Sequence, residues 1–290
     1  MSSIDSARRR ASAGQPAAPQ GALASTLPKV DGTFLINAGV TCALTASGLF
    51  CPQGPLIWYK ALGVAFVAIA SAVLLSAAVV TGLSERSANR LQGPRRAPAP
   101  IARELRDTAI AAWIAACLVA WALSRAFSGA PIGLVWDLNA AGGAAAVALQ
   151  NLGALLVLDA WLYWKHRLLH TRLLFRFHRE HHTFRDPTAF AGFAVGPVEA
   201  VLTFWPIALL AIPSATHYGP VYFTLVVSFV LLNLYLHCGV ASRFIEAVLP
   251  RLFVNTSVHH NRHHARAGVN FSEAFTLWDH LCRTRERDHG

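Results

Sequence analysis

Histidines are the residues of this chain whose type and spacing could do chemistry. Ten of the 13 histidines, all except His217, His280 and His289, form a series between positions 166 and 264. The series consists of His166-Arg-Leu-Leu-His170, His178-Arg-Glu-His181-His182, the lone His237, and His259-His260-Asn-Arg-His263-His264. Neutral imidazole is the commonest nitrogen ligand for iron, zinc and copper. Because eight to ten imidazoles exceed what one ion can coordinate, the histidines predict a site for two metal ions.

The spacing inside each group suits ligation. In a helical H-x-x-H-H box, positions i, i+3 and i+4 lie on one surface, so three imidazoles can be divided between two ions. Such boxes begin at His178 and His260, whereas His259 is out of register with the last box. We therefore leave open whether His259 is a ligand.

Acidic and aromatic residues accompany the histidines. Asp159, Tyr163, His166 and His170 are separated by four, three and four residues, which places them on one stripe of a helix. An ionisable group in an apolar helix usually has a functional partner. We expect Asp159 to accept the N–H of a ligating imidazole and so fix its orientation. Asp279 is a further candidate, and for Glu199 a role in the site and an ion pair with a loop arginine stay open.

The composition indicates a membrane protein. Apolar residues make up 54% of the chain and charged residues 14%, below the roughly 25% of a soluble domain. A helix needs about 20 mostly apolar residues to cross the hydrocarbon layer. Six predicted crossings are Phe34 to Phe50, Ala61 to Leu83, Thr108 to Phe127, Ala141 to Trp164, Phe193 to Pro213 and Val221 to His237. The first run is the shortest and Lys60 lies at the edge of the second, so these two could instead form a re-entrant or interfacial pair. An odd number of crossings is also possible.

The basic residues predict the orientation. With six crossings and the N-terminus inside, 23 of the 25 lysines and arginines fall on the cytoplasmic side, and Lys60 and Arg125 fall outside. This asymmetry follows the positive-inside rule, so the net charge of +10 has a topological explanation. It does not indicate nucleic-acid binding. The same topology brings the histidine boxes and both termini to the cytoplasmic side and places His217 in an outer turn.

The expected fold is therefore an all-α polytopic membrane bundle with a cytoplasmic, histidine-rich cap that holds two metals. Residues 1–33 are rich in Ala, Ser, Pro and Gly and predict a disordered basic arm. Residues 34–83 form an N-terminal transmembrane pair, 105–285 the catalytic membrane domain, and 286–290 a tail. Five cysteines without a C-x-x-C pair do not predict a disulfide framework.

These motifs resemble the fatty acid hydroxylase superfamily, which includes sterol desaturases and sterol C4-methyl oxidases. The resemblance covers about residues 105–285. It is carried by Asp159-Ala-Trp-Leu-Tyr163-Trp-Lys-His166-Arg-Leu-Leu-His170, the boxes at His178 and His260, Asn270-Phe-Ser and Leu277-Trp-Asp279. The family commonly has a histidine pair before its last box, whereas Ala241 stands four residues after His237 here. Either His237 or His259 could complete the metal shell.

The resemblance implies a membrane-embedded non-haem di-iron oxygenase. Its expected ligands are His166, His170, His178, His181, His182, His237, His259, His260, His263 and His264, supported by Asp159, Tyr163 and Asp279. Imidazole-bound ferrous iron can reduce dioxygen and generate an oxidant for unactivated C–H bonds. Two iron ions are the expected cofactor, although histidines alone would also hold zinc, for example in a purified sample.

The expected reaction is hydroxylation or desaturation of a lipid that enters from the bilayer. Each turnover needs two external electrons, and the sequence has no flavin, haem or iron–sulfur motif. We expect a ferredoxin or a cytochrome b5-type donor, attracted by cytoplasmic arginines. Two alternatives are a carotenoid hydroxylase and a metal-binding transporter or sensor without redox chemistry. The clustering of the boxes at one membrane boundary disfavours the transporter, whose ligands should lie near mid-membrane.

Overall fold

The computed structural model describes residues 31–95 and 98–286, and these residues form an all-helical bundle with one very short sheet. The long helices are α2 (Gly32–Ser47), α3 (Pro55–Glu85), α4 (Ile101–Phe127), α5 (Gly143–Leu169) and α7 (Gly219–His237). The short α-helices are α6 (Pro197–Phe204), α8 (Arg243–Val248), α9 (Ser257–Arg266) and α10 (Leu277–Leu281). The predicted arm of residues 1–33 lies almost entirely outside the described residues, as does most of the tail.

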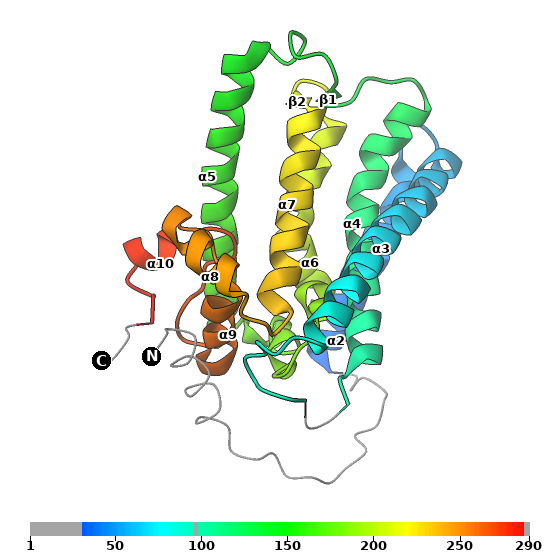
Figure 1. Cartoon of the computed structure of the whole chain (residues 1–290). Helices are drawn as coiled ribbons and strands as arrows, with labels where there is room; N and C mark the ends of the chain where they lie inside the picture. Colours follow the sequence, from blue (N-terminus) through cyan, green and yellow to red (C-terminus); the bar gives the residue numbers. More distant parts are fainter. Residues whose placement is uncertain (1–30, 96–97, 287–290) are drawn as a thin grey trace.

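Short 3₁₀ helices and one strand pair complete the fold. The 3₁₀ helices are η1 (Gly48–Phe50), η2 (Phe175–Phe177), η3 (His181–Thr183), η4 (Ala189–Phe193), η5 (Trp205–Ala211) and η6 (Leu249–Leu252). Strands β1 (Leu134–Val135) and β2 (His217–Tyr218) pair in parallel, with Leu134 opposite His217. This pair lies at the end of the bundle opposite α9 and α10 (Figure 1).

Five of the six predicted crossings coincide with helices that are long and apolar enough to span a membrane. These helices are α2 with η1, α3, α4, α5 and α7. In the most apolar window of α4, 56% of the residues are buried, against 17% in α3, α5 and α7. Helix α4 is therefore the central helix, and the other three expose long apolar faces such as Leu149, Leu152 and Leu156 of α5. Such faces suit a hydrocarbon surrounding.

The predicted crossing from Phe193 to Pro213 differs from the prediction, because no single long helix forms there. Helix α6 gives way to η5 at Trp205, directly before Pro206. Proline lacks the N–H that would bond the carbonyl of Leu202 and clashes with it. The indole N–H of Trp161 donates to that carbonyl instead, at 2.7 Å. The helices α6 and η5 together are about 26 Å long. They still connect the end of the bundle that carries α9 to the end that carries β1, where the N–H of Gly133 donates a hydrogen bond to Leu210 O.

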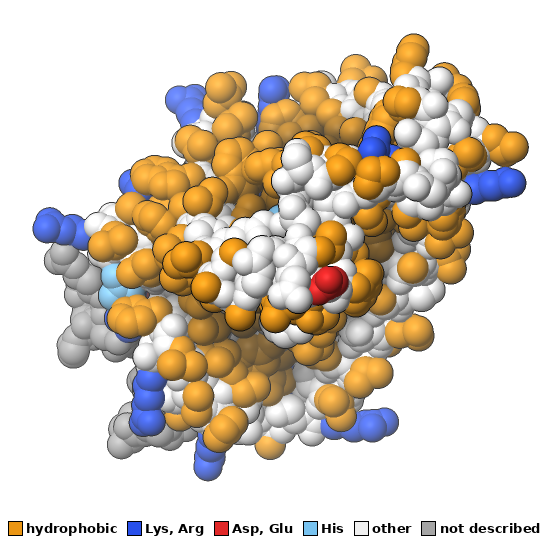
Figure 2. All heavy atoms as spheres, turned by 90° about the horizontal axis from the view of Figure 1, so that it is seen from above, with side chains coloured by type: hydrophobic (Ala, Val, Ile, Leu, Met, Phe, Trp, Pro, Cys, Tyr) orange, Lys and Arg blue, Asp and Glu red, His pale blue; other side chains and the backbone are white. Residues whose placement is uncertain are grey.

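The two ends of the bundle differ in character. Viewed from the β1–β2 end, hydrophobic side chains cover most of the surface and basic side chains lie at its margin (Figure 2). The opposite end carries η2, η3, α9, α10 and the loops between them, where α5 and α7 end (Figure 1). All the histidines of the boxes belong to these elements.

Candidate metal centre

Nine of the ten predicted histidine ligands come together in two adjacent groups at this end of the bundle. The five-histidine group consists of His166, His170, His178, His182 and His263. The four-histidine group consists of His181, His237, His260 and His264. Within each group, one ring nitrogen from every residue lies within 4.8 Å of the others. The ring centroids of His182 and His264, one from each group, are 4.6 Å apart, so the two groups are in direct contact.

Each group is assembled from separate elements. His166 lies on α5, His170 caps it, and His237 is the last residue of α7. Each H-x-x-H-H box contributes to both groups. From the box at His178, His178 and His182 belong to the five-histidine group and His181 to the four-histidine group. From the box at His260, His263 belongs to the five-histidine group, and His260 and His264 belong to the four-histidine group. The final box lies on α9, which begins where Thr256 accepts a hydrogen bond from His259 N–H. The earlier box bends through η3.

In three of the histidines, a hydrogen bond at Nδ1 orients the ring so that Nε2 points towards the other histidines of the group. His166 Nδ1 lies 2.7 Å from Phe271 O, and His263 Nδ1 lies 2.7 Å from Val269 O. His237 Nδ1 lies 2.9 Å from Asn233 O. A carbonyl oxygen only accepts hydrogen bonds, so each of these Nδ1 atoms carries the hydrogen and each Nε2 keeps a lone pair. This tautomer is the one a metal ligand needs.

Several of these lone pairs are buried and face one another. His166 Nε2 is buried and has no hydrogen-bond partner among the described residues. The Nε2 atoms of His178 and His263 both approach His182 Nε2, at 3.1 and 3.2 Å. One N–H of His182 could satisfy only one of them. A buried acceptor without a partner is unfavourable, whereas a cation between the rings would use every lone pair. The donor set therefore fits metal ions, and imidazole suits iron.

Burial keeps four of the grouped imidazoles neutral, those of His181, His260, His263 and His264. It lowers the pKa of His263 to about 3, helped by the neighbouring His178 and opposed by the hydrogen bond to Val269. Burial and the nearby histidines also lower the pKa of His181, His260 and His264 well below its ordinary value. Neutral imidazoles can ligate metal without first losing a proton.

Among the described residues, Glu199 is the carboxylate within hydrogen-bond distance of a histidine of the two groups. Its two oxygens lie 2.9 and 2.8 Å from His178 Nδ1, and both side chains are buried. The sequence left open whether Glu199 serves the site or pairs with an arginine, and the structure places it against His178. Helix α6 begins at Pro197, which puts Glu199 in its first turn facing the loop of His178.

Asp159 and Asp279 act on the site through the backbone. Asp159 Oδ1 accepts a hydrogen bond from Phe275 N–H at 2.9 Å. This differs from the prediction that Asp159 would accept an imidazole N–H, a role that Phe271 O takes for His166. Asp279 accepts N–H bonds from Phe271 at 2.9 Å and Ser272 at 3.1 Å. The two carboxylates therefore fix the segment that supplies this carbonyl.

Tyr163 and His259 also contact this C-terminal segment. Tyr163 is fully buried, and its hydroxyl lies 2.9 Å from Thr284 Oγ1. His259 lies outside both groups, and its Nε2 is 3.0 Å from Asp279 Oδ2. On α9, His259 is one residue and therefore about 100° away from His260, which turns it towards α10. Hydrogen bonds from His259 and Thr284 outweigh burial and lower the pKa of Asp279.

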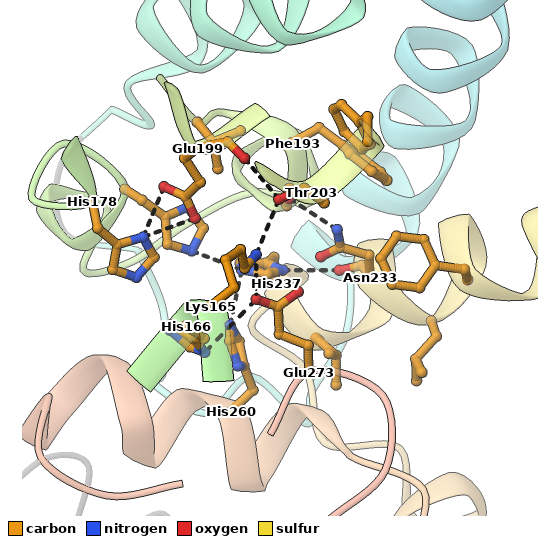
Figure 3. Close-up of a pocket in the computed structure, with 17 residues that line it drawn as sticks. Lys165, His166, His178, Phe193, Glu199, Thr203, Asn233, His237, His260 and Glu273 are labelled. Carbon is orange, nitrogen blue, oxygen red and sulfur yellow. Dashed lines mark hydrogen bonds and ion pairs between the residues drawn. The ribbon is translucent and has the colours of Figure 1, made fainter. Parts of the chain in front are cut away.

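A pocket opens from the histidines towards α6 and α7 (Figure 3). Its apolar wall includes Phe193, Phe204 and Phe229, and its inner end includes His166, His178, His181, His237 and His260. Four polar residues in its wall were not predicted from the sequence: Lys165, Thr203, Asn233 and Glu273. A lysine next to His166 inside an apolar run was the signal that could have revealed the first of them.

Comparison with known proteins agrees with the geometry. Residues 151–284 match the family model described as fatty acid hydroxylase. All nine grouped histidines fall in this range. This part of the chain is therefore similar to the fatty acid hydroxylase family.

Curated relatives are similar over the same region. Human lathosterol oxidase is 34% identical over 124 residues, which are 42% of this chain and 40% of the relative. A Delta(7)-sterol 5(6)-desaturase of Gibberella zeae is 32% identical over 139 residues, 45% of this chain and 36% of the relative. A sphingolipid C4-hydroxylase of Schizosaccharomyces pombe is 32% identical over 145 residues, 47% and 48% respectively. The chain thus covers less than half the length of each. No solved structure matches it.

Proposed function

We propose that this protein is a membrane-bound non-haem di-iron oxygenase that hydroxylates or desaturates a lipid. The observation that carries the proposal is the pair of adjacent histidine groups, five and four, at the inner end of an apolar pocket. Two iron ions would be held by the nine histidines and would supply the dioxygen chemistry that breaks an unactivated C–H bond. His259 is not proposed as a ligand.

The chain's own residues would orient the ligands and exclude water. Glu199 and the carbonyls of Phe271, Asn233 and Val269 hold four imidazoles through their Nδ1 hydrogens. The aromatic wall of the pocket would keep bulk water from the reacting carbon. Because α5 and α7 are apolar helices whose outer faces suit lipid, a substrate could enter this pocket from the bilayer.

The reaction balances with one dioxygen and two external electrons. Hydroxylation converts R–H, O₂, two electrons and two protons into R–OH and water, whereas desaturation removes two hydrogens from adjacent carbons and forms two waters. We infer a ferredoxin or a cytochrome b5-type donor. Exposed arginines gather near the histidines, including Arg172, Arg176, Arg179 and Arg266, and would attract an acidic partner. This end of the bundle is proposed to face the cytoplasm, as the basic residues predict.

Two measurements test the proposal. The purified protein should contain about two iron ions per chain when it is prepared without oxygen or chelators. A deletion strain should accumulate a lipid that is lighter by one oxygen or heavier by two hydrogens than the missing product. Whole-cell metal uptake should not change, which separates this function from transport.

Variants connect the activity to the site. His181→Ala and His263→Ala each remove a ligand from one group and should abolish lipid oxidation while membrane insertion persists. His217→Ala is the matched control, because His217 lies in β2 at the opposite end. Full turnover by either ligand variant, or equal loss in the control, would overturn the proposal.

A further inference from the structure

A buried ion pair lies in the wall of the pocket next to the five-histidine group. Lys165 Nζ is 2.6 Å from Glu273 Oε1 and 3.0 Å from Thr203 Oγ1. The Lys165 side chain is 2% exposed and that of Glu273 is 19% exposed. All three residues line the pocket, and Figure 3 shows Lys165 and Glu273 between His166 and Thr203. A charged amine inside an apolar helix is costly and usually has a functional reason.

The fold does not depend on this pair to join its elements. Helix α5 already contacts the C-terminal segment through Asp159 with Phe275 and through His166 with Phe271. It contacts α6 through Trp161 and Leu202. Replacing a buried ion pair by apolar residues is often neutral or stabilising. Stability alone is therefore a poor explanation for charges in this wall.

We propose that Lys165, Glu273 and Thr203 form a subsite that binds a neutral hydroxyl group of the lipid substrate, close to the carbon that is oxidised. This inference rests on the proposed function and names the substrate class: a lipid alcohol. A hydroxyl both donates and accepts, so it can donate to the Glu273 carboxylate and accept from the Lys165 ammonium.

The charges of the pocket favour a neutral group. Besides the histidines, its ionisable side chains are Lys165, Glu199 and Glu273. A carboxylate or phosphate beside Lys165 would also lie beside Glu273, and an ammonium group would lie beside Lys165. Either arrangement brings like charges together without water. A hydroxyl avoids both.

The position of the pair sets which carbon reacts. Glu273 Oε1 lies 3.9 Å from His166 Nδ1, and the opposite nitrogen of that ring faces the five-histidine group. The imidazole ring of His166, itself a proposed ligand, therefore lies between the subsite and the centre of the five-histidine group. A hydroxyl held there would place the carbons a few bonds away against the inner end of the pocket.

Competition binding tests the subsite without turnover. The full chain, with its metal and in lipid nanodiscs, is held without dioxygen and reductant, and bound tritiated hexadecan-1-ol is displaced by unlabelled probes of equal chain length. The probes are hexadecan-1-ol, hexadecane, hexadecanoic acid and hexadecylamine. The alcohol should compete at least about tenfold better than the other three, the gain expected from hydrogen bonds to charged groups.

Variants assign that preference to the pair. The double variant Lys165→Met with Glu273→Met should remain folded and metal-loaded and should lose the preference for the alcohol over hexadecane. Thr203→Val should weaken the preference more mildly. Lys60→Met, which changes an exposed lysine of α3 that does not line the pocket, should leave the preference unchanged. A circular dichroism melt and a metal assay on every variant identify any that fails to fold. If the double variant does not fold, the subsite is tested with Thr203→Val.

The outcomes separate the subsite from the proposed function. Equal competition by hexadecane, strongest competition by the acid or the amine, or an unchanged alcohol preference in the double variant would each overturn the subsite. Lipid oxidation is measured separately on the same preparation with dioxygen and a reductant. Alcohol binding that depends on the pair, in a protein that oxidises no lipid, would support the subsite and refute the oxygenase.

Discussion

Replacing Glu199 should weaken metal binding in the five-histidine group selectively. Both carboxylate oxygens of Glu199 lie within 2.9 Å of His178 Nδ1, and the pair is buried. A hydrogen bond to a charged group contributes about 1.5–3 kcal/mol. In Glu199→Leu this bond is lost and the buried Nδ1–H has no acceptor. Since 1.4 kcal/mol corresponds to a factor of ten, the ion should bind about 10- to 100-fold more weakly.

Glu199→Gln provides an intermediate case. The amide oxygen can still accept the His178 N–H, but a neutral acceptor contributes about half as much as a charged one. The expected loss of affinity is about tenfold or less. The order of metal affinity should be wild type, then Glu199→Gln, then Glu199→Leu.

The assay is competition with a series of chelators, read as metal ions per chain after equilibration. Glu199→Leu should release one ion to a weaker chelator than wild type requires, while the ion of the four-histidine group is retained. Glu104→Gln is the matched control, because Glu104 is a buried carboxylate that accepts hydrogen bonds from Thr188. The reasoning is refuted if Glu199→Leu keeps both ions as tightly as wild type, or releases both together.

Three further predictions concern other parts of the site. His264→Ala removes one member of the four-histidine group and should leave about one tightly bound ion per chain by elemental analysis; retention of two would contradict the grouping. His259→Ala should keep both ions but lower the unfolding free energy by about 1–3 kcal/mol, because Asp279 loses a buried hydrogen-bond partner. Loss of metal without loss of stability would instead indicate that His259 is a ligand. Gly192→Ala adds a Cβ 3.2 Å from His237 Nδ1 and should reduce lipid oxidation. Gly153→Ala is the control, because the added Cβ meets no atom within 4 Å, and it should not reduce lipid oxidation. Equal activity of the two variants would contradict the expected clash with His237.

The sequence alone predicted the long apolar helices and the meeting of the histidines, because both depend on local patterns. A run of about 20 apolar residues is legible without tertiary information. Positions 260, 263 and 264 share one helical face whatever surrounds them. The same periodicity predicted that Asp159, Tyr163 and His166 would lie on one stripe, and all three contact the C-terminal segment.

The partners of these residues were decided by tertiary packing. Most acceptors of the imidazole hydrogens are backbone carbonyls, such as Phe271 O and Val269 O, and a carbonyl has no signature in a sequence. Asp159 was expected to orient an imidazole and instead holds the backbone of Phe275, because α5 packs against that segment there.

The broken fifth segment and the burial of Lys165 show the same division. Pro206 signals a break, but only the packing of α5 on α6 provides Trp161 to satisfy the carbonyl that the proline leaves free. A lysine beside His166 is visible in the sequence, yet its ion pair with Glu273 joins residues 108 positions apart (273 − 165). The sequence determined which chemical groups are available and the regular helices that carry them. The folded chain determined which group meets which, because contacts between distant segments depend on how the helices pack.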